Sequence, residues 1–223
     1  MMMASPVSAS KITAASYADP TDRYDHGVLG DAIEYGALVL TLDTGKQLRI
    51  VLPESRVFED IEPRLADLDG DGAPEVMVVE TDANLGARLS VYGVDGLITA
   101  TPFIGRTYRW LAPIGAADLD GDGAIEVAYV DRPHLARIIR VWRFQDGELK
   151  FVAETPGYTN HRIGEDTIAG GIRNCGPTPE MIVADAGWQS ILAVTFKDGK
   201  FAAKTLGPHL GRSSFAKAMN CEN

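Results

Sequence analysis

The stretch ADLDGDGAPE at residues 66–75 returns as ADLDGDGAIE at residues 117–126, and each copy carries carboxylates at alternate positions. A calcium ion takes six to eight oxygen ligands, and a tight loop of alternating carboxylates supplies them when glycine lets the backbone turn. The sequence therefore predicts two calcium ions, one in each loop. The predicted ligands, with the alanines contributing backbone carbonyls, are Asp67, Asp69, Asp71, Ala73 and Glu75 in the first copy and Asp118, Asp120, Asp122, Ala124 and Glu126 in the second.

Two other interpretations of these loops are weaker. Asp and Gly also form ordinary turns, but the crowded acidic groups would repel one another without a cation, and a chance turn would not repeat. An EF-hand loop runs to twelve residues and lies between helices. Here the residues that follow, EVMVVE at 75–80 and EVAYV at 126–130, are β-branched and apolar and predict strands.

The repeat extends along the whole chain. Asp67 and Asp118 are 51 residues apart, and four strand-turn-strand patterns recur at intervals of 51 or 52 residues. Glycine in a short turn between two β-rich segments predicts a hairpin. Each repeat would then hold four antiparallel strands, so the sequence predicts an all-β fold, a small β-propeller with four blades of about 51 residues. The turn glycines of the four patterns are Gly45, Gly96, Gly147 and Gly199.

The two ends of the chain lie outside the regular repeat and are interpreted separately. The opening MMMASPVSAS has no apolar signal-peptide segment, so residues 1–20 are interpreted as a poorly ordered leader remnant or added segment, ahead of a single propeller domain at 21–223. The first repeat lacks one inner strand, and FAKAMNCEN at 215–223 aligns with EPRLADLDG at 62–70. We therefore expect the C-terminal segment to pair as a strand into the first blade and close the ring.

The D-x-D-G-D-G-x-x-E loops, the preceding IGAADLDGDG at 114–123 and the 51-residue spacing resemble FG-GAP/VCBS repeats, which occur in integrin α-subunit propellers and many bacterial extracytoplasmic proteins. The resemblance covers about residues 24–223, and the two loops are its specific part. It implies a propeller with calcium bound in loops between the first two strands of a blade. The chain departs from the pattern in having Glu at the ninth position, and in the degenerate loops GGIRNCGPTPE at 170–180 and AMNCEN at 218–223.

The chain contains two cysteines, Cys175 and Cys221, each following an asparagine within a degenerate loop. They are predicted to form a disulfide that ties the C-terminal segment to the last blade; two unpaired thiols are the alternative. A disulfide requires an oxidising compartment, and calcium sites of millimolar affinity also favour a place outside the cytoplasm. Both features predict a periplasmic or secreted protein.

Charge and motifs exclude several classes of function. The chain has 21 basic and 31 acidic residues and a formal net charge of −10, which disfavours nucleic acid as a partner. Its sequence has no apolar run long enough to span a bilayer and no basic membrane-binding stripe, so membrane insertion is not expected. Hydrolase, metalloprotease and nucleotide-binding motifs are also absent from the sequence.

The residues that enter the inner strands form the candidate ligand site. RVFEDIEP at 56–63, YRWLAPIG at 108–115 and HRIGEDTI at 161–168 align on the loops. Their charged and aromatic members would meet at one mouth of a propeller channel, where ligands commonly bind. The alternative is that these side chains pair with one another and fill the channel. The candidates are Glu59, Asp60, Arg109, Trp110, His161, Arg162, Glu165 and Asp166.

Two classes of function remain open. The sequence favours a calcium-binding module that binds a protein or a glycan. The alternative is a polysaccharide hydrolase or lyase that uses carboxylates at the channel mouth, and such chemistry needs two carboxylates at a defined separation.

Overall fold

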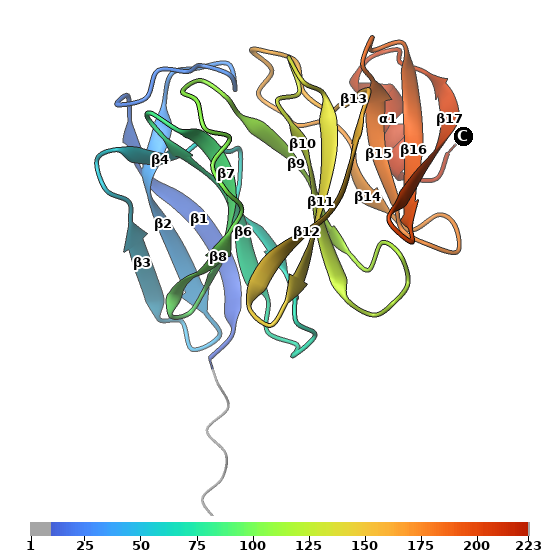
Figure 1. Cartoon of the computed structure of the whole chain (residues 1–223). Coiled ribbons are helices and arrows are strands. Elements are labelled where there is room, and N and C mark those ends of the chain that lie inside the picture. The colour runs from blue at the N-terminus through green and yellow to red at the C-terminus, as the bar shows by residue number, and fades with distance from the viewer. Residues whose placement is uncertain (1–9, 223) are drawn as a thin grey trace, which may run out of the picture.

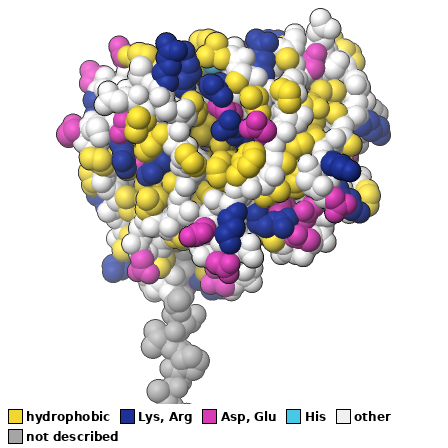
Figure 2. All heavy atoms as spheres, viewed as in Figure 1, with side chains coloured by type: hydrophobic (Ala, Val, Ile, Leu, Met, Phe, Trp, Pro, Cys, Tyr) yellow, Lys and Arg dark blue, Asp and Glu magenta, His cyan; other side chains and the backbone are white. Residues whose placement is uncertain are grey.

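A computed structural model of the chain describes residues 10–222. This part of the chain forms seventeen strands and one short helix, and its sheets lie side by side in a row (Figure 1). On the face drawn in Figure 2, acidic and basic side chains are interspersed with apolar ones. The predicted all-β class is confirmed.

The first sheet contains eight strands in the order β1-β2-β4-β6-β7-β8, with β3 paired to β2 and β5 paired to β6. These strands are β1 (Ile12–Thr21), β2 (Glu34–Leu42), β3 (Gln47–Val51), β4 (Arg56–Phe58), β5 (Arg64–Ala66), β6 (Glu75–Asp82), β7 (Gly86–Gly93) and β8 (Gly96–Ala100). Within this sheet, β5 to β8 pair in sequence order as a four-stranded antiparallel meander. That meander is the unit expected for one blade.

The other two sheets repeat the meander. The second sheet consists of β9 (Leu111–Ala117), β10 (Ile125–Asp131), β11 (Ile138–Gln145) and β12 (Glu148–Pro156). The third consists of β13 (Tyr158–Thr159), β14 (Gly171–Arg173), β15 (Glu180–Asp185), β16 (Ser190–Lys197) and β17 (Lys200–Pro208). The helix α1 (Arg212–Met219) follows β17.

All four predicted hairpins are confirmed, as β2–β3, β7–β8, β11–β12 and β16–β17. The φ angles of their turn glycines lie between 73° and 107°. Side chains rarely adopt this left-handed region, whereas glycine enters it freely. The glycine spacing therefore predicted correctly where the chain reverses.

The apolar central strands are buried on both faces. Along β6, Val76 and Val78 belong to the core shared with β1 and β2, whereas Met77 and Val79 belong to the core shared with the second sheet. Alternate residues of β10 and of β15 are divided between two cores in the same way. Since neighbouring residues of a strand point to opposite faces, a strand covered on both sides needs apolar residues at successive positions. This explains the apolar segments that follow the Asp-rich loops.

The N-terminal segment departs from the prediction. Residues 12–21 form β1, which pairs antiparallel with β2. Ile12 is buried in the first core, and the ring of Tyr17 stacks on those of Tyr35 and Phe58. The prediction of a poorly ordered segment is therefore wrong for residues 12–20, because tertiary pairing with β2 orders a sequence that has few large apolar residues. Residues 1–9 lie outside the described part of the chain.

The C-terminal segment also departs from the prediction. Arg212–Met219 form the helix α1, which packs on the third sheet, so the predicted strand in the first blade is wrong. Phe215, Ala218 and Met219 are spaced three and four residues apart, which places them on one face of a helix. This face packs against Ile182 and neighbouring residues of the third sheet. The helix thus covers a face of the last sheet that another blade would cover in a closed ring.

Strand pairing within residues 10–222 does not join the first and last sheets into a ring. The two ends are linked by a loop contact instead, in which the N–H of Gly164 donates to the carbonyl of Val28 at 3.0 Å. Stacked antiparallel sheets are established, and a closed four-bladed ring is not. The described residues contain no helix that is long and apolar enough to cross a membrane.

Candidate metal loops and ligand pocket

Two Asp-rich loops occupy equivalent places in successive meanders. Asp loop 1 (residues 67–75) connects β5 to β6, and Asp loop 2 (residues 118–126) connects β9 to β10. Both lie at the lower end of the molecule in Figure 1, the same end as the hairpin turns. This is the place that the resemblance to FG-GAP/VCBS repeats implied.

Asp67 organises the backbone of Asp loop 1. Its Oδ1 accepts a hydrogen bond from the N–H of Gly70 at 2.8 Å, and its Oδ2 accepts one from the N–H of Gly72 at 3.0 Å. These glycines have φ angles of 76° and 81°, the region that a side chain would disfavour. Asp69 and Asp71 each accept the N–H of the residue two places ahead. The loop therefore curls so that its carboxylates converge.

Asp loop 2 repeats this arrangement. Asp118 accepts the N–H groups of Gly121 at 2.8 Å and Gly123 at 3.0 Å, and Asp120 and Asp122 again accept the N–H two residues ahead. In each loop, one oxygen from each of the three aspartates lies within 4.8 Å of the other two. Two oxygens that share a calcium ion at about 2.4 Å lie at most about 4.8 Å apart. Both triads therefore fit a hard cation.

The ninth-position glutamates bind the backbone of their own loops. Oε2 of Glu75 accepts the N–H of Leu68, and Oε2 of Glu126 accepts that of Leu119, each at 2.9 Å. Burial raises the pKa of both carboxyls, and these hydrogen bonds oppose the rise. Neither glutamate belongs to the compact triads. Coordination of calcium stays a prediction for the six aspartates of the triads and equally for Glu75, Glu126, Ala73 and Ala124.

Asp loop 2 faces a guanidinium. Arg143 on β11 donates from Nη2 to Asp120 at 2.8 Å and from Nε to Glu126 at 2.7 Å. Its Nη1 lies 2.8 Å from Oδ2 of Asp122. One cationic side chain therefore bridges three carboxylates of this loop. Arg143 was not among the residues predicted from the sequence. Comparing the repeats could have indicated it, because the equivalent residue 51 places earlier is Tyr92 and the arginine departs from the repeat.

Asp loop 1 has a different neighbour. The Nζ of Lys11 donates to the backbone carbonyl of Gly72 at 2.9 Å. Within residues 10–222, no ion pair involves the carboxylates of Asp67, Asp69 or Asp71. The negative charge of Asp loop 1 is therefore held by backbone N–H groups, with one lysine nearby.

A disulfide joins the third, degenerate loop to the C-terminal segment. Cys175 and Cys221 form a disulfide with their Cα atoms 5.6 Å apart, which confirms the predicted pairing. Arg173 donates from Nε to Glu180 at 2.8 Å and from Nη1 to the carbonyl of Ala218. These contacts hold the end of α1 against the third loop, where the aspartates of the other two loops are missing.

Comparison with known families agrees with this geometry. Residues 67–129 match the family model described as an FG-GAP-like repeat. This chain carries an FG-GAP-like repeat. The matched stretch begins at Asp67 and ends within β10, so it contains both Asp loops, although the resemblance was expected over about residues 24–223. No curated protein matches the chain.

The first two of the eight candidate ligand-site residues are buried and paired. The carboxylate of Glu59 lies 2.5 Å from Nδ1 of His26 and accepts the hydroxyl of Thr81 at 2.6 Å. Burial raises the pKa of Glu59, and the contact with His26 acts against the rise. Asp60 is buried and accepts Nη1 of Arg64 at 2.7 Å. Both side chains are therefore buried and paired with residues outside the candidate set.

Trp110 and His161 are buried as well. The indole N–H of Trp110 donates to the carbonyl of Glu59 at 2.8 Å, and its ring meets that of His161 edge-on. Nδ1 of His161 lies 2.9 Å from Nε2 of His134. Burial, together with the neighbouring His161, lowers the pKa of His134 to about 4, so this imidazole is neutral at pH 7.

The remaining candidates are divided between two hollows. Arg109 lines one of about 230 Å³, beside His26 and Tyr108. Arg162 and Glu165 line another of about 360 Å³ beside α1. Asp166 is exposed and pairs with Arg212, a residue of that second hollow, at 2.7 Å. Arg109 therefore lines a different hollow from Arg162 and Glu165, although the three were expected to lie together.

Proposed function

We propose that this chain is a calcium-stabilised binding module of the FG-GAP-like propeller type. The observation that carries the proposal is the pair of Asp triads, each compact enough to share one cation and each lying within the matched FG-GAP-like stretch. Four hairpins at intervals of 51 or 52 residues support four blades. The finer features, which are two calcium ions and a closed ring, form part of the proposal.

Calcium would stabilise the strands that each loop connects. Without a cation, the carboxylates of a triad repel one another at short range. A cation that binds the folded loop and not the unfolded chain stabilises the fold by mass action. The Asp loops lie between the first and second strands of their meanders, so their order bears directly on the pairing of β5 with β6 and of β9 with β10.

The proposed place of action is periplasmic or extracellular. The Cys175–Cys221 disulfide supports it, because disulfides form and persist mainly in oxidising compartments. Calcium at millimolar concentration is available there to sites of modest affinity.

The alternative of a polysaccharide hydrolase or lyase has less support. Both carboxylate oxygens of Glu59 already hold partners, and its side chain is fully buried. Glu165 lines the hollow beside α1, while Asp166 is paired at the surface. We therefore propose binding and not bond cleavage.

Isothermal titration of chelator-treated, dialysed protein with calcium chloride tests the proposal. We expect two binding events, one lost in Asp69→Asn and the other in Asp120→Asn. Asp95→Asn, at an exposed aspartate in the β7–β8 turn, is the matched control and should keep both. Absence of calcium binding in the unaltered protein, or equal losses in all three variants, would refute the calcium sites.

A further inference from the structure

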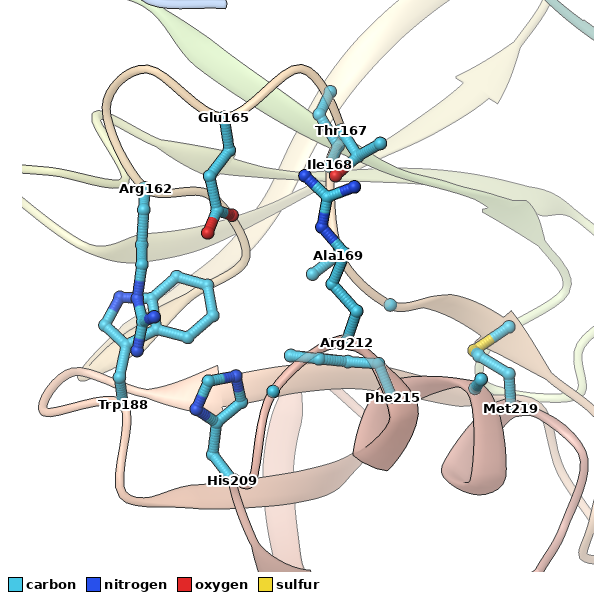
Figure 3. A pocket seen from close by; sticks show the side chains of 13 residues that line it. Arg162, Glu165, Thr167, Ile168, Ala169, Trp188, His209, Arg212, Phe215 and Met219 are labelled. Atoms are coloured by element: carbon cyan, nitrogen blue, oxygen red, sulfur yellow. The ribbon is translucent and has the colours of Figure 1, made fainter.

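The hollow beside α1, called here the α1 pocket, is formed by three segments that are distant in sequence. Residues 162–170 form one wall, Trp188 in the β15–β16 turn forms a second, and residues 209–219 form the third (Figure 3). Its volume of about 360 Å³ is within the usual range for small-ligand pockets, which begins at about 300 Å³. The Asp loops lie at the opposite end of the sheets, so a ligand here would not share the calcium ions.

One wall of the α1 pocket presents an unpaired guanidinium. The Cζ atom of Arg162 lies 4.4 Å from the ring centroid of Trp188, so the cation stacks on the indole. No carboxylate pairs with Arg162 in the part of the chain that the structure describes. Stacking orients the guanidinium while its N–H edge keeps its donors, and this geometry suits bidentate recognition of a carboxylate.

Two further polar side chains face the same space. The carboxylate of Glu165 points into the pocket from the loop above it, and no hydrogen bond to that carboxylate is formed by the described residues (Figure 3). The ring of His209 meets that of Trp188 edge-on. Burial, followed by the nearby Arg162, lowers the pKa of His209 and favours the neutral imidazole. A carboxylate acceptor and a neutral imidazole suit hydroxyl groups.

The far side of the pocket is apolar. Ile168, Ala169, Phe215 and Met219 line it, and the last two come from the face of α1 that packs on the third sheet. Such a surface accepts the C–H face of a ring and offers it no hydrogen bonds. The pocket therefore combines a guanidinium that pairs with no carboxylate among residues 10–222, acceptors for hydroxyl groups, and an apolar wall.

We propose that the α1 pocket binds a carboxylate-bearing sugar, one uronic acid unit of an acidic glycan. The sugar carboxylate pairs with Arg162, its hydroxyl groups bond to Glu165 and His209, and its C–H face lies against Phe215 and Ile168. A neutral sugar lacks the partner for Arg162, and a simple carboxylate lacks the ring and hydroxyl groups. This inference rests on the proposed role of the chain as a binding module and names the class of ligand.

Titration with glucuronate, followed by tryptophan fluorescence and by calorimetry in calcium-containing buffer, tests this assignment. We expect saturable binding, with glucose and acetate each at least about tenfold weaker, because glucose lacks the carboxylate that pairs with Arg162 and acetate lacks the ring and the hydroxyl groups. Arg162→Ala should weaken glucuronate binding by about tenfold or more, and Arg162→Lys by less. Arg109→Ala, in the neighbouring hollow, should leave it unchanged.

Each contrary result would contradict a specific part of the proposal. If glucose bound as tightly as glucuronate, Arg162 would not recognise the carboxylate. If acetate bound as tightly as glucuronate, the site would be one for small anions only. Undiminished binding by Arg162→Ala, or no saturation with glucuronate at tens of millimolar, would overturn the pocket assignment. Melting temperatures of the same samples with and without calcium separate this failure from that of the calcium proposal. Arg162 is exposed, so its substitution should not impair folding.

Discussion

Asp loop 1 and Asp loop 2 share the sequence DLDGDGA and the same pattern of backbone hydrogen bonds, yet they differ in the charge that faces them. Arg143 bridges three carboxylates of Asp loop 2, whereas Lys11 reaches only a backbone carbonyl of Asp loop 1. Local sequence sets the shape of each triad. The neighbouring strand sets its balance of charge.

This difference implies unequal dependence on calcium. In Asp loop 2 the guanidinium already compensates the carboxylates, and calcium must compete with its charge-assisted hydrogen bonds. In Asp loop 1 the compensation is smaller, so a cation should bind more tightly and contribute more to stability. The third loop replaces both arrangements with a disulfide that is independent of calcium.

The largest effect is expected at the third loop. The Cys175–Cys221 bond closes a separation of 46 residues, which corresponds to about 4 kcal/mol on the chain-entropy description. The double variant Cys175→Ser/Cys221→Ser should therefore melt roughly 10 °C lower by calorimetry. The loss should be equal with calcium and with chelator. A loss that appears only without calcium would show that the third loop is coupled to the Asp loops.

Loss of a single calcium site should have the next largest effect, and the two sites should differ. At a calcium concentration one hundred times the dissociation constant, each site contributes about 2.7 kcal/mol. The variant Asp69→Asn should lose more of the calcium-dependent rise in melting temperature than Asp120→Asn, as measured by thermal unfolding. Equal losses would remove the distinction between the two loops, and a larger loss for Asp120→Asn would reverse it.

Substitution of Arg143 should make the loops more alike. We expect Arg143→Gln to tighten calcium binding at Asp loop 2 by about tenfold, the equivalent of about 1.4 kcal/mol, and to lower stability in chelator. Calorimetry measures the first change and thermal unfolding the second. Arg140→Gln, on the same strand but paired with Asp131 and Glu154, is the control and should leave calcium affinity unaltered. Weaker calcium binding in Arg143→Gln would mean that the arginine supports the metal site.

The smallest effect is expected from Lys11. Its hydrogen bond to Gly72 is exposed, so Lys11→Ala should cost about 0.5 kcal/mol in chelator, measured by urea unfolding. Calcium affinity at Asp loop 1 should change little. A tenfold change in that affinity would show that Lys11 is a counter-charge comparable with Arg143.

The local elements were predictable because neighbouring residues decide them. The Asp loops depend on carboxylates that bond N–H groups two to five residues ahead, and the hairpins depend on glycines at positive φ. The repeat interval also placed the cysteines in facing loops, although it could not show which element carried Cys221. That residue follows a helix and not a strand.

The sequence by itself determined the all-β class, the two triads and the four turns, since each follows from spacing within a few residues or from the repeat. Only the tertiary structure decided that β1 orders the N-terminal segment and that α1 covers the last sheet. It also placed Arg143 opposite Asp loop 2 and joined Arg162 with His209 in one pocket. These last contacts join residues 17 to 47 positions apart, and they depend on strand register and helix packing, which no local pattern fixes.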